Sequence, residues 1–270
     1  MRLRRRHLAH PVTSARSFLT RRAERRERPA TATDRHEPGA APSADDEFRR
    51  VALDGLRALN RTNSIRAYHP LFGLTAAEQA EFPQPKRLVD IRWERIQPNL
   101  PATGSALDIG SQYGWFTFNL AEHGLHAVGV EYSGKAVRVS QLLTVYNRAN
   151  RAAFLQMDVS PATVRALPAV DVVVCMAIFH HWVRTQGYEA AKDIMEALAD
   201  RCRDRLFFES GQVDDTDSVD RSSIGFMGDS PKHWLEGFLR GLGFAQVTHL
   251  GELPRAGTNE RTRHLFMASR

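Results

Sequence analysis

Cysteine and long hydrophobic runs are both scarce in this 270-residue sequence. The two cysteines, Cys175 and Cys202, form no metal-binding pattern; they fit a reducing compartment, although two cysteines could also pair. The longest uninterrupted apolar run, Val172–Phe179, is far too short to cross a bilayer. No apolar run follows the arginine-rich first residues, so no secretory signal is predicted. We therefore expect a cytoplasmic protein with no transmembrane segment and no bound metal.

A net basic charge is also missing from most of the chain. Residues 1–50 hold thirteen Arg and seven Asp or Glu, whereas the rest holds 24 basic and 24 acidic residues. The neutral part gives no indication of a nucleic-acid-binding face. Residues 1–46 are predicted to form a disordered arginine-rich tail. This tail is either simply solvated or contacts an anionic surface such as a membrane, RNA or an acidic protein.

What the sequence does contain is a βαβ unit with a glycine-bearing turn. Strands are predicted over Ser105–Ile109 and His126–Val130, with a helix over Trp115–His123 that stops at Gly124. The turn between the first strand and the helix, residues 110–114, lies where open α/β sheets bind nucleotide-like ligands. Its glycines permit a sharp turn and a close approach to a ligand.

The spacing in this turn indicates a family. Asp108, Gly110 and Gly114 form a D-x-G-x-x-x-G pattern, and Glu131, which could accept both hydroxyls of a ribose, follows about twenty residues later. The pattern resembles that of the class I S-adenosylmethionine (SAM) methyltransferases, with Gln112 where that family often has a third glycine. The alternative is an ordinary βαβ turn of another α/β protein. The resemblance implies SAM as cofactor, bound by Asp108, Gly110, Ser111, Gln112, Gly114, Glu131, Asp158, Val159 and Met176.

The rest of the chain continues the alternation of strands and helices. Strands are predicted over residues 153–157, 170–177 and 205–209, and helices over 133–148, 188–201 and 231–240. The last two predicted strands, 244–250 and 263–267, have no helix between them and should pair as an antiparallel hairpin. Seven strands in this plan resemble the Rossmann-like α/β sheet of class I methyltransferases, with expected order 3-2-1-4-5-7-6 and the last strand antiparallel. Asp158 could instead cap the helix that Pro161 begins.

Three regions are therefore predicted: the tail of residues 1–46, a helical extension of residues 47–100, and the methyltransferase domain of residues 101–270. In many methyltransferases such an extension covers the cofactor and shapes the acceptor pocket. Arg92 and Trp93 would then line the site. Alternatively they belong to an amphipathic helix packed on the sheet, with Arg92 and Arg95 in solvent.

A closer resemblance covers residues 175–187, which are similar to the segment after the fourth strand in bacterial O-antigen chain-terminating methyltransferases. That group methylates a sugar-linked phosphate, and RNA end-capping phosphate methyltransferases look related over the same stretch. The segment holds His180 and His181, which are candidates for a base if the acceptor is a hydroxyl. A phosphate or carboxylate acceptor needs cations instead. Either histidine could be structural, and we expect at most one to act, His181 slightly less readily because the chain turns towards a helix there.

These features predict a SAM-dependent methyltransferase that acts on an oxygen atom of a sugar, a glycan phosphate or a secondary metabolite. An RNA or tRNA methyltransferase is one alternative, which the neutral charge beyond residue 50 disfavours. The other is a SAM-binding partner protein without catalytic activity, with the tail as its interaction arm.

Overall fold

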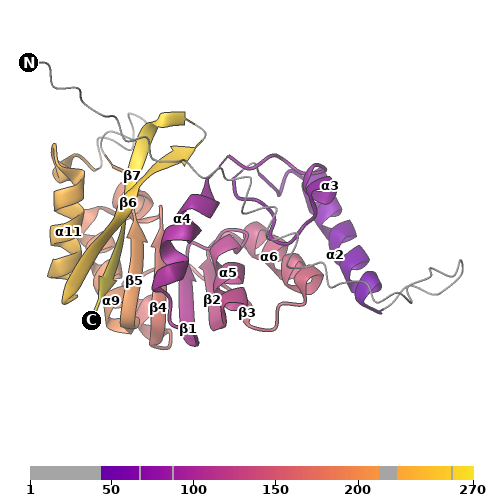
Figure 1. Ribbon diagram of the computed structural model, residues 1–270, viewed down its shortest axis with the longest axis horizontal. Coiled ribbons are helices and arrows are strands. Elements are labelled where there is room, and N and C mark those ends of the chain that lie inside the picture. The colour runs from indigo at the N-terminus through magenta and orange to yellow at the C-terminus, as the bar shows by residue number, and fades with distance from the viewer. Residues whose placement is uncertain (1–43, 67, 87, 213–223, 257) are drawn as a thin grey trace, which may run out of the picture. The chain divides into compact units, whose positions relative to one another are not determined.

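One seven-stranded sheet organises the part of the chain that the computed structural model describes (Figure 1). Its strands are β1 (Gly104–Ile109), β2 (Leu125–Glu131), β3 (Ala152–Gln156), β4 (Val170–Met176), β5 (Cys202–Glu209), β6 (Gln246–Ala256) and β7 (Thr258–Ser269). Their order, β3-β2-β1-β4-β5-β7-β6, and the antiparallel pairing of β7 with both neighbours confirm the predicted class I methyltransferase sheet. The described residues are 44–66, 68–86, 88–212, 224–256 and 258–270, so the predicted tail lies outside them as far as residue 43.

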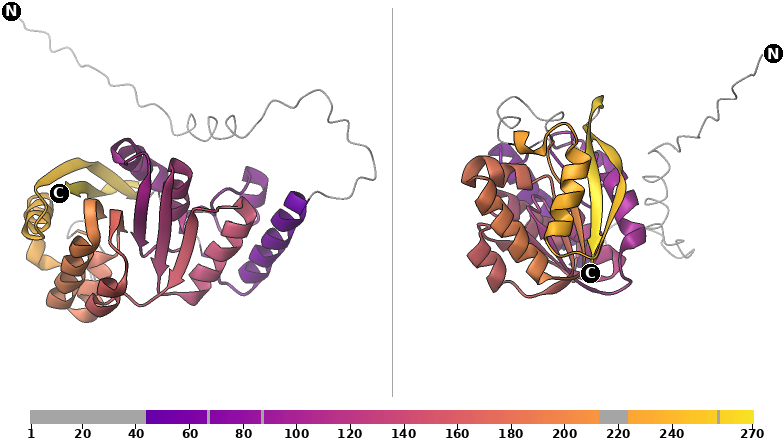
Figure 2. Two further views of the ribbon diagram at one scale, coloured as in Figure 1. Left: turned by 90° about the horizontal axis from the view of Figure 1, so that it is seen from below. Right: turned by 90° about the vertical axis from the view of Figure 1, so that its left-hand side faces the viewer.

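Helices cover both faces of the sheet, because the central strands are apolar on both sides. Val172, Val173 and Val174 of β4 are fully buried. α5 (Trp115–His123) and α6 (Gly134–Asn147) pack on β1, β2 and β3, while α9 (Tyr188–Arg201) packs on β5 and α11 (Pro231–Gly241) on β6 and β7. α4 (Val89–Ile96) packs on β6, and the right-hand view of Figure 2 shows it on the opposite side of the hairpin from α9 and α11. Within the described ranges, no helix combines the length and apolar character that a membrane span requires.

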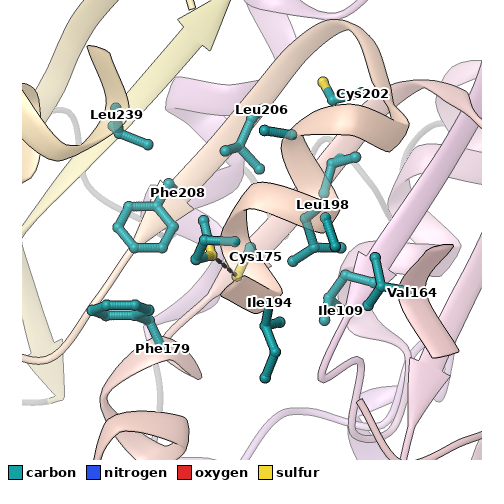
Figure 3. Packing of buried hydrophobic residues seen from close by; sticks show 14 of the residues in the cluster. Ile109, Val164, Cys175, Phe179, Ile194, Leu198, Cys202, Leu206, Phe208 and Leu239 are labelled. Atoms are coloured by element: carbon teal, nitrogen blue, oxygen red, sulfur yellow. Dashed lines mark hydrogen bonds between the residues drawn. The ribbon is translucent and has the colours of Figure 1, made fainter. Parts of the chain in front are cut away.

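The hydrophobic core holds both cysteines as free thiols. Cys175 of β4 lies inside the cluster shown in Figure 3, with its Sγ 3.9 Å from the Sδ of Met195. Burial raises the pKa of both thiols, that of Cys202 to about 11, so neither is a reactive thiolate near neutral pH. The alternative that the two cysteines pair is therefore wrong for this structure.

Helix starts account for several differences from the predicted plan. α2 (Ala44–Arg61) begins early enough that residues 44–46 are helical and not part of a tail. α7 (Pro161–Ala166) is capped by the hydroxyl of Ser160, so the alternative that Asp158 caps this helix is wrong. α8 (Phe179–Gln186) occupies the segment after β4 to which no helix was assigned.

The terminal hairpin is longer than predicted. β6 and β7 stay paired from the sheet edge at Gln246 and Ser269 out to Ala256 and Thr258, through two irregularities in register. Polar residues dominate the outer part of both strands, so hydrophobic periodicity alone did not reveal it.

The segment before β1 is helical and is held against α6 by side-chain contacts. It contains α2, α3 (Ala76–Gln79), α4 and the 3-10 turn η1 (Gln97–Asn99), and α2 packs against α6. The hydroxyl of Tyr146 on α6 donates to Glu78 Oε2 at 2.6 Å and accepts from Arg49 of α2. We call residues 44–100 the cap.

A buried ion pair joins the cap to the carboxyl end of β5. Arg92 of α4 and Glu209 are both almost fully buried. The Nε and Nη2 atoms of Arg92 donate to the two carboxylate oxygens of Glu209 at 2.7 and 3.2 Å. Nη1 of Arg92 also donates to the carbonyls of Leu88 and Pro254, and Arg263 of β7 brings its Nη1 to 3.9 Å from the same carboxylate. The alternative that Arg92 is solvated is therefore wrong.

We predict that Arg92→Leu lowers the free energy of unfolding by about 3–5 kcal/mol, because it removes the bidentate partner of a buried carboxylate. Urea titration followed by circular dichroism measures the effect. Arg95→Leu, an exposed position on the same helix, is the matched control and should leave the midpoint nearly unchanged. Equal midpoints for wild type and Arg92→Leu would contradict the prediction.

Candidate active site

A cavity of about 810 Å³ opens at the carboxyl ends of the parallel strands. It lies around the end of β1, whose two neighbours β2 and β4 mark the point where the strand order reverses. Open α/β sheets bind their ligands at such a point. One wall comes from the strand ends and the turn after β1, a second from α8, and a third from the cap, which supplies Arg66, Tyr68, His69, Val89 and Arg92.

The turn after β1 is held in shape by glycine and by Glu131. Gly110 has a φ of 73°, a conformation that favours glycine, and a Cβ at this position would lie 2.5 Å from Ile178 Cδ1. Gln112 has a φ of 50°, and its N–H donates to Glu131 Oε2 at 3.0 Å. The other carboxylate oxygen of Glu131 accepts from the N–H of Ser133 at 2.9 Å. Glu131 therefore lines the cavity and also holds the backbone of two segments, the turn after β1 and the start of the segment after β2.

Asp108 braces the start of α5 from the end of β1. Its Oδ2 accepts from the N–H and from the hydroxyl of Thr117, at 3.0 and 2.7 Å. Complete burial raises the pKa of the Asp108 carboxyl to about 7; the two hydrogen bonds from Thr117 oppose this shift, and the charge of Glu131 adds to it. Asp108 thus positions the turn and also reaches the cavity wall.

The structure brings most of the predicted cofactor residues into this one cavity. They are Asp108, Gly110, Ser111, Gln112, Glu131, Asp158, Val159 and Met176. Gly114 does not line it: this residue caps α5 with a φ of 79°, and a Cβ there would lie 2.3 Å from the ring of Phe154. Packing and helix entry therefore explain the glycine at this position.

The two adjacent histidines have different surroundings. His180 lies outside the cavity lining, is almost fully buried, and accepts a hydrogen bond at Nδ1 from the N–H of Gly211 at 2.9 Å. His181 lines the cavity next to Trp182. We expected His181 to act less readily than His180 because the chain would turn towards a helix there. That reason is wrong, because α8 already begins at Phe179 and includes both histidines.

Several lining residues were not anticipated from the sequence: Arg66, Tyr68, His69, Tyr132, Arg184 and Glu209. Glu209 ends a predicted strand as Glu131 does, so the rule applied to Glu131 could have found it. No motif in the sequence around Arg66 indicated that this loop would line the cavity. It is attached to the turn after β1 by Tyr113, whose hydroxyl accepts from the N–H of Arg66 at 2.8 Å. Among the residues with described positions, no three His, Cys, Asp or Glu side chains gather as metal ligands.

The sheet and the site together define a class I methyltransferase fold, and comparisons with known proteins agree. A methyltransferase-domain family matches residues 107–204. Two curated Escherichia coli proteins, each an O-antigen chain terminator bifunctional methyltransferase/kinase WbdD, are 25% identical over 115 residues, which is 42% of this chain and 16% of theirs.

Solved structures of WbdD give the same result for the fold. The complex of WbdD with the kinase inhibitor LY294002 aligns with a TM-score of 0.61 and 20% identity over 78% of this chain and 47% of that one. The 2.2 Å structure of WbdD aligns equally well over 78% and 46%. The chain therefore matches less than half the length of these relatives.

Residues 107–204 match the methyltransferase-domain family, and the sheet has the strand order of class I methyltransferases, as the turn and the strand plan predicted. These two findings support a methyltransferase whose cofactor is SAM. The residues of the cavity fit that group. Ser111 Oγ and Gln112 Oε1 are buried beside the turn with no hydrogen-bond partner among the described residues, and Glu131 and Asp158 add carboxylates to the same wall. These polar atoms match a cofactor that carries ribose hydroxyls, an adenine amino group and an amino-acid end.

We predict that Glu131→Ala weakens SAM binding by about 1.5–3 kcal/mol, because it removes charge-assisted hydrogen bonds to the cofactor and loosens the turn. Isothermal titration calorimetry with SAM measures the change. Glu122→Ala removes an exposed carboxylate from α5 outside the cavity and should bind SAM like wild type. Unchanged affinity in Glu131→Ala would remove this residue from the site.

The raised pKa of Asp108 predicts a pH-dependent stability. Between about pH 4 and 7 the folded protein retains a proton that the unfolded chain has lost, so the stability from this group falls as pH rises through that window and is constant above it. Over this window the free energy of unfolding falls by about 4 kcal/mol. Asp108→Asn has no carboxyl to titrate at this position. The difference in unfolding free energy between wild type and this variant should therefore change by about 4 kcal/mol between pH 4 and 7. Curves for wild type and Asp108→Asn that stay parallel from pH 4 to 7 would contradict the prediction.

Proposed function

We propose that this chain transfers the methyl group of SAM to an oxygen atom of a sugar, a glycan phosphate or a secondary metabolite. The observation that carries the proposal is that one cavity joins the cofactor turn to a second wall holding His181, Trp182 and Arg184. Bound SAM supplies an electrophilic methyl group on a sulfonium sulfur. The similarity to WbdD, an O-antigen chain terminator bifunctional methyltransferase/kinase, supports a glycan-type acceptor.

The residues of the chain contribute by holding the two reactants together. Methyl transfer to oxygen depends mainly on orienting the acceptor beside the methyl group. Glu131 and Ser111 hold the cofactor side, while Trp182 offers an apolar surface to the acceptor. Arg184 and Arg66 suit an acceptor with polar or anionic groups. The cap closes the third side and limits access of water.

An RNA acceptor is less well supported. Residues 51–270 hold equal numbers of basic and acidic side chains, so they provide no excess of positive charge for a phosphate backbone.

The proposal is tested by incubating the full chain with SAM that carries a radiolabelled methyl group and with separate glycan, small-metabolite and RNA fractions. We expect label in the glycan or metabolite fraction. Glu131→Ala should incorporate far less at limiting SAM. Label in RNA alone would overturn the proposal in favour of an RNA methyltransferase. SAM binding by calorimetry without label in any fraction would instead indicate a non-catalytic binding protein.

A further inference from the structure

His181, which is half-buried, and Arg184, which is exposed, are in contact in the cavity wall. They lie three residues apart on α8, a spacing that places side chains on the same helix face. Arg184 Nη2 lies 3.2 Å from His181 Nδ1. Both residues line the cavity.

A guanidinium has only donors and remains protonated at all accessible pH values. At this contact Arg184 must therefore donate, and His181 Nδ1 must accept through an unprotonated lone pair. A neutral imidazole carries one N–H, which is then on Nε2.

We propose that Arg184 fixes His181 in the Nε2–H tautomer, so that His181 donates a hydrogen bond to an anionic acceptor oxygen, such as that of a glycan phosphate, and does not act as a general base. An anionic oxygen has no proton to lose when it takes the methyl group, so the transfer needs no base. Arg184 is then a positioning residue. This inference rests on the proposed function for the identity of the ligand, but the tautomer itself does not. It also replaces the base assignment expected from the sequence, because a base at Nε2 would need a free lone pair there.

The same helix supplies an internal reference. His180 accepts at Nδ1 from the N–H of Gly211, so it too is an Nε2–H tautomer, and its partner is independent of Arg184. The ring centroids of His180 and His181 lie 4.2 Å apart, so both report on the same local fold. Other charged groups on this cavity are Arg66, Asp108, Glu131, Asp158 and the paired Arg92 and Glu209, with His69 as a further titratable ring.

The test uses the full chain with ¹⁵N-labelled histidine and long-range ¹H–¹⁵N correlation spectra at pH 8, without added ligand. His181 signals are assigned by their loss in His181→Gln. We expect the Nε2–H pattern for His181 in wild type, a mixture of tautomers in Arg184→Leu, and recovery of the wild-type pattern in Arg184→Lys, which retains a donor. His180 should be unchanged in every variant, which shows that α8 remains folded. An Nδ1–H pattern for His181 in wild type, or the same pattern in wild type and Arg184→Leu, overturns the proposal.

A second measurement tests the donor role in the fraction that wild type labels. Glutamine keeps an N–H donor but cannot take up a proton, so His181→Gln should stay within about tenfold of the wild-type rate, whereas His181→Ala should lose about 10²-fold. Equal losses in the two variants would mean that His181 acts as a base or is only structural. The spectra need no acceptor, so failure to find one leaves the tautomer result standing by itself.

Discussion

The buried pair between Arg92 and Glu209 is the contact on which the arrangement of the cavity depends. A carboxylate at the end of a buried strand requires a compensating charge, and here that charge comes from the cap. The same guanidinium donates to the carbonyl of Pro254 in β6, so it connects the cap, the parallel sheet and the terminal hairpin. Because all three parts border the cavity or support its border, the site exists only when the chain before β1 and the chain after β5 are folded together.

The cofactor side shows how a turn can be built without the third glycine that the family often has. Gln112 adopts a positive φ, which strains a residue with a side chain, but its N–H is held by Glu131. Asp108 holds the following helix through Thr117. A hydrogen bond to Glu131 therefore holds Gln112 in a backbone conformation that glycine would adopt without strain. Glu131 therefore stabilises the backbone of this turn in addition to any contact it makes with a ribose.

Most strands were predictable because they are apolar runs punctuated by glycine and proline, and five of them alternate with helices. Their order in the sheet was predicted from the resemblance to class I methyltransferases. The elements that escaped prediction lack that signal. The outer hairpin is polar, and the pairing of Arg92 with Glu209 joins residues 117 positions apart. The different surroundings of His180 and His181 could not be predicted either, because they depend on Gly211, which follows a strand far along the sequence. Strand-end residues such as Glu131 were predictable, whereas the cap loop that carries Tyr68 and His69 was not.

For His181, residue type and position alone led to one prediction, and its contact with Arg184 led to a different proposal. A histidine after the fourth strand was expected to be a base because imidazole titrates near neutrality. That expectation assumes that the nitrogen facing the ligand has a free lone pair. In our proposal the neighbouring guanidinium donates to the lone pair of Nδ1, and the remaining nitrogen carries the proton. The spacing His-x-x-Arg was present in the sequence, but it has this meaning only on a helix, and the helix over Phe179–Gln186 became evident only from the structure. An acceptor positioned by an N–H donor must present an oxygen lone pair to it, and the anionic oxygen of a phosphate does so without a proton that would have to be removed during the transfer.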